Sequence, residues 1–157
     1  MADLVATLSD WLLLGHVLAA MVWLGGGVML AALATLTVRV GDADAVRRFV
    51  RPLRIVGPAV LAPATIAVVG LGVWLVLREA AWSFGQTWVW LALALFAVAF
   101  VVGAAFQSRA AVRAERASER GEDAEARRQL ARWVAGYLLI LALLVAIAWD
   151  MVFKPGL

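Results

Sequence analysis

The sequence predicts an all-α polytopic membrane protein, a four-helix transmembrane bundle that forms one domain over residues 1–157. Hydrophobic residues make up 65% of the chain and charged residues only 16%, and the mean hydropathy is +0.93. These values are far more apolar than a soluble domain of this size needs. Four segments also reach the length of about 20 mainly apolar residues that crosses the hydrocarbon of a bilayer.

The four predicted spans cover residues 11–38, 55–77, 88–106 and 133–153. We expect the first span to stay in the mature protein, because no basic region precedes it and its apolar run is longer than that of a signal peptide. Gly57, Pro58 and Pro63 predict a bend in the second span. Small residues such as Ala99 and Gly103 are expected at helix contacts.

The arginines predict the orientation of the bundle. Five lie in residues 39–54 and seven in residues 109–132, so twelve of the fourteen basic residues lie on one side of the membrane. The positive-inside rule places that side in the cytoplasm and both termini outside, which is an N-out/C-out topology in a bacterial cytoplasmic (inner) membrane. Six of the eight tryptophans fall at the predicted outer ends, as expected of an aromatic belt.

The loop over residues 108–132 is rich in Ala, Glu and Arg, which favour helix. Gly121 interrupts it, and Glu122 and Asp123 are helix-start residues. We therefore predict that the third and fourth helices continue into the cytoplasm as a charged helical hairpin. We expect this hairpin to be a solvated pair of helices with mixed charges, and a regulatory or partner-binding tip is the alternative.

Several functional classes are excluded by composition. The chain has no cysteine, which rules out disulfides, thiolate metal sites and cysteine nucleophiles. It has no phosphate-binding glycine loop and no recognised nucleophile motif, which argues against hydrolase and nucleotide-driven chemistry. The net charge of +3 comes from arginines that orient helices, so nucleic acid is not an expected partner. The expected partners are the lipid bilayer and a second copy or another membrane protein.

His16 and Asp150 are the only ionisable residues inside the predicted spans, where burial is costly. The topology brings both to the outer leaflet, where they can pair. His16 shares a helix face with Ala20, Trp23 and Gly27. The other polar residues of the spans are expected to hydrogen-bond within or between helices: Thr35, Thr37, Thr65, Gln107 and Tyr137.

Two interpretations of this face stay open. In the functional one, neutral His16 coordinates a haem iron or a copper ion, Asp150 orients the imidazole, and Trp23 and Gly27 accommodate a flat group. In the structural one, His16 and Asp150 form an interhelical hydrogen bond, and the glycines at 25 to 27 allow close packing. A second metal ligand would have to come from Met21, from Met151 or from His16 of a second copy.

The runs "HVLAAMVWLGGGVMLA", "GPAVLAPATIAVVGLGVWLVLREAAWSFGQTWVWLAL" and "WDMVFKPG" resemble a bacterial family of small predicted integral membrane proteins of uncharacterised function. More distantly, His16, Trp23 and Gly25 resemble the first helix of copper-resistance D-type membrane proteins and membrane-bound protoporphyrinogen oxidases. The second resemblance implies haem or copper handling with His16 as a ligand.

The leading functional hypothesis is a membrane protein that binds haem b, or alternatively copper, through His16, with Asp150 behind it. The alternative is a non-enzymatic membrane subunit or scaffold in which His16 and Asp150 only tie helices together. A small transporter that uses the bent second helix is the third hypothesis.

Overall fold

The computed structural model describes residues 7–156, and this part of the chain is helical with no strand. Its elements are α1 (Leu8–Val40), α2 (Ala43–Val56), η1 (Gly57–Leu61), α3 (Ala62–Arg78), α4 (Thr87–Val101), η2 (Val102–Gln107), α5 (Ser108–Glu119) and α6 (Asp123–Phe153). Because α2, η1 and α3 run on without a break, as do α4, η2 and α5, four long helices result, each apolar enough to span a membrane. The predicted fold class, an all-α four-helix membrane bundle, is confirmed.

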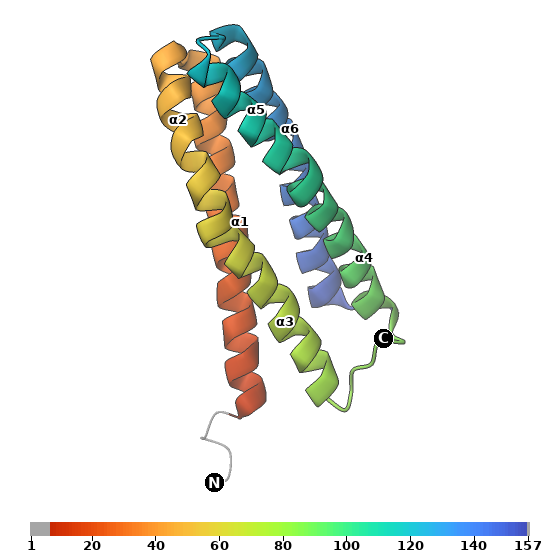
Figure 1. Ribbon diagram of the computed structural model, residues 1–157. Coiled ribbons are helices and arrows are strands. Elements are labelled where there is room, and N and C mark those ends of the chain that lie inside the picture. Colours follow the sequence, from red (N-terminus) through yellow and green to blue (C-terminus); the bar gives the residue numbers. More distant parts are fainter. Residues whose placement is uncertain (1–6, 157) are drawn as a thin grey trace.

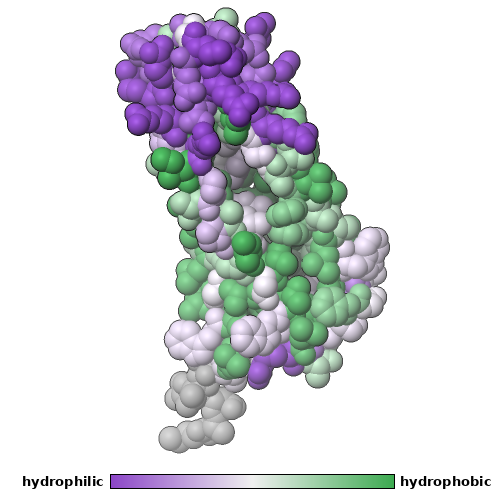
Figure 2. Space-filling model, viewed as in Figure 1, coloured by the Kyte–Doolittle hydropathy of each residue, from purple (hydrophilic) through white to green (hydrophobic). Residues whose placement is uncertain are grey.

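The four long helices run antiparallel to their chain neighbours (Figure 1). The start of α1 and the end of α6 lie at the same end of the molecule. At the opposite end, α2, α5 and the first turns of α6 gather the hydrophilic residues (Figure 2). We call this the charged end. The apolar body below it exposes large hydrophobic side chains such as Leu33, Ile66 and Phe100, as a surface that faces lipid requires.

Local sequence signals account for the helix ends. The Thr7 hydroxyl accepts a hydrogen bond from the Asp10 amide, and the Asp10 carboxylate accepts one from the Thr7 amide at 2.7 Å, which is a capping box at the start of α1. Asp42 caps α2 by accepting from the Ala45 amide at 2.8 Å. The predicted break at Gly121 is confirmed, since this glycine has φ +73° in the turn of the α5–α6 hairpin.

The first inter-span loop differs from the prediction. The second span was expected to begin at residue 55, but the helix begins at Ala43. Val46, Val50 and Leu53 recur at helical spacing and are buried, and α2 packs against α5 of the hairpin. The sequence carries this amphipathic signal, with arginines opposite the apolar stripe, and the prediction missed it because it assigned the arginines only to loops that orient the spans.

Two wide helical turns interrupt the long helices. The π-helical η1 contains Gly57 and Pro58, two of the residues on which the predicted bend rests, and Pro58 has no amide hydrogen to continue an α-helical ladder. The second wide turn, η2, contains no proline and is not signalled by the sequence. The prediction that Ala99 and Gly103 lie at helix contacts is confirmed. Ala99 is 1% exposed, and a Cβ at Gly103 would lie 3.9 Å from the Ile140 side chain.

Packing differs between the two halves of the bundle. At the charged end α2 packs on α5, and α5 packs on α6. In the other half α3 packs on α1, and α4 packs on α6, whereas no Cα atom of α3 lies within 8 Å of a Cα atom of α4 or α6. The α3–α4 side of the bundle is therefore open between the backbones in this half, and α1 and α6 form its central pair (Figure 1).

Candidate functional site around His16

His16 lies on the face of α1 that packs against α3. The side chain is 9% exposed, and its Nδ1 lies 2.8 Å from the Val68 carbonyl oxygen. Because a carbonyl only accepts, Nδ1 carries the proton and Nε2 of the neutral ring is a free lone-pair donor. Among residues 7–156, Nε2 has no hydrogen-bond partner.

Gly72 lets α3 approach the imidazole. A Cβ atom at this position would lie 3.1 Å from Cε1 and 3.3 Å from Nδ1 of His16, which is closer than ordinary contacts. The ring is therefore held between its own helix and the Val68–Gly72 turn of α3. Sequence reasoning missed both residues of α3, although a glycine at position 72 inside a span was a signal for a close helix contact.

Trp23 and Gly27 form the inner part of the predicted face, and both are packed. Trp23 is 6% exposed, and its ring meets Phe96 of α4 edge-on, with centroids 5.8 Å apart. Gly27 faces Tyr137 of α6 so closely that a Cβ would lie 2.5 Å from the phenol oxygen. The space that the sequence assigned to a flat group beside Gly27 is therefore filled by the Tyr137 ring.

Asp150 lies on α6 near the height of His16. Gly27 of α1 and Tyr137 of α6 are in contact, and the two helices are antiparallel. His16 precedes Gly27 and Asp150 follows Tyr137 by nearly the same number of residues, so His16 and Asp150 lie within about 3 Å of the same level along the bundle axis. No hydrogen bond or ion pair joins them: His16 bonds to Val68. The Asp150 side chain is 0% exposed, and neither carboxyl oxygen has a hydrogen-bond partner among the described residues.

The other polar residues of the spans divide into two groups. As predicted, the hydroxyls of Thr35, Thr37 and Thr65 donate to carbonyls one turn earlier in their own helices, at 2.7–2.8 Å. The same expectation is wrong for Gln107 and Tyr137. Their buried side-chain polar atoms have no partner within residues 7–156. Gln107 instead packs near Gly136, and the Tyr137 phenol packs against Gly27.

The sequence matches the family described as "Predicted integral membrane protein (DUF2269)" over residues 10–155. The chain belongs to this family. The family covers the helical bundle almost from end to end, so this protein is an integral, multi-pass membrane protein in contact with the lipid bilayer. No curated protein and no solved structure matches the chain. The match agrees with the resemblance of the chain to a family of small predicted integral membrane proteins. It gives no support to the more distant resemblance to copper-resistance D-type proteins and protoporphyrinogen oxidases.

The "WSFGQTW" stretch before α4 and the "WDMVFKPG" stretch at the end of α6 meet at the end of the bundle opposite the charged end. The Lys154 ammonium lies 4.6 Å from the Trp82 ring centroid and 5.4 Å from that of Trp88, which are cation–π distances. The Trp88 indole donates to Gln86 at 3.2 Å, and Gly156 packs on Thr87. The "WSFGQTW" and "WDMVFKPG" stretches thus clasp α4 to α6. Sequence reasoning assigned these tryptophans to a membrane belt and missed this contact.

The donor set limits what metal chemistry this site can perform. Among the described residues, no group of three or more His, Asp or Glu side chains is placed to hold a metal ion. Met21 is 63% exposed and so lies on the surface of the bundle instead of inside it. Within one chain His16 can supply a single nitrogen ligand, which suits one axial position of a haem and not a three-ligand copper site.

Proposed function

We propose that this integral membrane protein binds haem b through Nε2 of His16. The observation that carries the proposal is the hydrogen bond from Nδ1 to the Val68 carbonyl. Histidines that ligate metals usually donate their other ring nitrogen to a carbonyl or carboxylate, which fixes the tautomer and orients the ring. A bound haem would supply one-electron redox chemistry.

The residues around His16 fit such a group in part. The imidazole has the required tautomer and is held between α1 and α3. The Tyr137 ring fills the space beside Gly27. The haem would therefore lie against His16 itself, without a contact to Gly27. Copper is the second choice, because His16 would need further ligands from another chain.

A second function is favoured by a specific observation. The His16–Val68 bond joins α1 to α3, and the backbone of α3 does not approach that of α4 or α6. His16 can therefore serve as a tie that holds α3 in the bundle. In that case the protein is a non-enzymatic membrane subunit or scaffold, and Asp150 contributes to packing only.

One experiment separates the two functions. The protein is purified in mild detergent from haem- and copper-replete cells, and optical spectra are recorded before and after dithionite reduction, with metal analysis on the same sample. His16→Ala removes both the ligand and the tie. His16→Asn keeps an amide N–H near the position of Nδ1, so it preserves the bond to Val68 and removes Nε2. Tyr137→Phe is the control for a change at a buried ring away from His16.

For a haem protein we expect a Soret band that shifts on reduction in the wild type and in Tyr137→Phe, and that is lost in both His16 variants. For a scaffold we expect no chromophore, a loosened bundle in His16→Ala and wild-type stability in His16→Asn. A colourless, metal-free wild type, or a Soret band that survives in His16→Asn, would contradict the haem proposal.

A further inference from the structure

A stripe of arginines runs along one face of α5. Arg109, Arg113, Arg116 and Arg120 follow each other at spacings of four, three and four residues, which places them on the same side of a helix. The stripe begins two residues after η2, where the apolar part of the long helix ends, and extends about 16 Å toward the tip of the hairpin. All four side chains are exposed.

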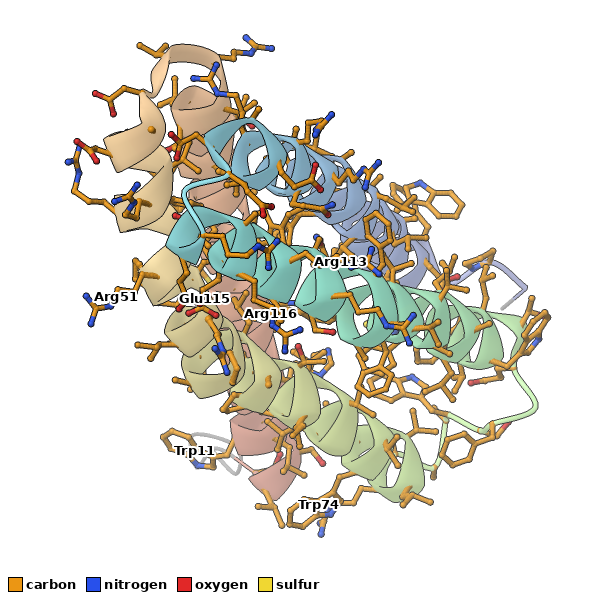
Figure 3. The ribbon with its side chains drawn as sticks, turned by 45° about the horizontal axis from the view of Figure 1, so that its top comes forward. Trp11, Arg51, Trp74, Arg113, Glu115 and Arg116 are labelled. Carbon is orange, nitrogen blue, oxygen red and sulfur yellow. The ribbon has the colours of Figure 1, made fainter. Side chains whose placement is uncertain are left out.

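The upper part of this stripe forms one wall of a groove. Arg113 and Arg116 of α5 and Arg120, the residue that follows α5, line it together with Glu125 and Gln129 of α6, and its volume is about 400 Å³. Figure 3 labels Arg113 and Arg116 on α5. The groove is lined by charged and amide side chains, and it belongs to the charged end, far from the His16 site.

Two of the acids near the groove are engaged with other residues. Glu122 is paired with Arg120 through two hydrogen bonds of 2.7 and 2.9 Å. Glu125 accepts from Gln129 at 2.6 Å and forms an ion pair of 2.7 Å with an arginine of its own helix.

Glu115, beside Arg116 in sequence, instead turns toward α2 and pairs with Arg54 at 2.6 Å. Within residues 7–156, Arg113 and Arg116 take part in no ion pair or side-chain hydrogen bond. Two guanidinium groups therefore lie one turn apart at the groove without a direct ion-pair partner, since the Glu125 carboxylate that lines the groove is bonded to other side chains. Like charges at this spacing repel each other, and an anion between them would remove that cost.

We propose that this groove binds a phosphate-bearing anion, with Arg113 and Arg116 as its ligands. A guanidinium presents a planar fork of N–H donors that matches phosphate oxygens, so two of them one turn apart can grip one phosphate group or two linked ones. The phosphate can belong to an anionic lipid headgroup, which the stripe meets where it leaves the apolar body, or to a soluble diphosphate that enters from the aqueous side.

The test uses the full-length protein and two probes. Inorganic pyrophosphate is titrated calorimetrically into detergent-solubilised protein, and phosphatidylglycerol binding is measured against phosphatidylcholine by native mass spectrometry. The groove variant is Arg113→Gln/Arg116→Gln. The matched control is Arg48→Gln/Arg51→Gln, which removes the same charge from exposed positions of α2 at the same end of the molecule; Arg51 projects outward from α2 (Figure 3).

We expect at least one probe to bind the wild type, and the groove variant to bind it about tenfold more weakly, while the control keeps nearly the wild-type affinity. Binding of pyrophosphate alone identifies a soluble ligand, and binding of the lipid alone identifies a headgroup site. Equal losses in the two variants, or no binding of either probe to the wild type, would overturn the proposal. Thermal unfolding of both variants checks that each is folded.

Discussion

Gly27 offers the sharpest test of the packing between α1 and α6. A Cβ atom at this position would lie 2.5 Å from the phenol oxygen of Tyr137 and 2.6 Å from its Cε1, whereas ordinary contacts begin at 3.4 Å. The ring would have to retreat by about 0.9 Å, and overpacking of this kind costs about 1–3 kcal/mol. We therefore expect Gly27→Ala to lower the free energy of unfolding by that amount.

The triple glycine supplies its own controls. A Cβ at Gly25 meets nothing within 4 Å, and one at Gly26 meets only Leu61 at 3.6 Å, so neither substitution to alanine should destabilise the bundle. Unfolding is followed by tryptophan fluorescence as a denaturing detergent is added to micelles. In a Tyr137→Ala background the penalty of Gly27→Ala should vanish, a coupling of about 1–3 kcal/mol. If Gly27→Ala is as stable as Gly25→Ala, or its penalty persists without the Tyr137 ring, the reasoning fails.

Three further outcomes are expected. Gly72→Ala should displace the His16 imidazole, since the new Cβ would lie 3.1 Å from Cε1, and NMR of a histidine-labelled sample should show a shifted ring signal. A membrane-impermeant maleimide should label Ser83→Cys in intact cells, whereas it should label Glu119→Cys only after the cells are permeabilised. The chain has no cysteine of its own, so no other site is labelled. The reverse labelling pattern would refute the predicted N-out/C-out topology. At the charged end, the Arg120 guanidinium holds the pKa of the Glu122 carboxyl below its ordinary 4.5. The ion pair therefore stabilises the fold above that pH, and the advantage over Glu122→Gln should disappear as the pH falls through the lowered pKa. Thermal unfolding of both proteins against pH measures this difference.

Much of the architecture follows from the sequence alone. The four spans, the hairpin break at Gly121 and the return of the chain to its starting end follow from the lengths of apolar runs and from local turn and capping residues. These signals are local, since one segment carries enough apolar surface to partition into a bilayer whatever its neighbours do. The common height of His16 and Asp150 followed from the same topology.

The contacts of the candidate site were decided by the tertiary structure. The sequence placed His16, Trp23 and Gly27 on one face of α1, but it did not indicate that His16 bonds to Val68 or that Tyr137 fills the space beside Gly27. The physical reason is that transmembrane helices are apolar on all sides, so hydropathy does not distinguish a face that meets lipid from one that meets another helix. The rotation of each helix and the choice of its neighbours are decided by close packing among small residues and aromatic rings, which exists only once the helices are assembled.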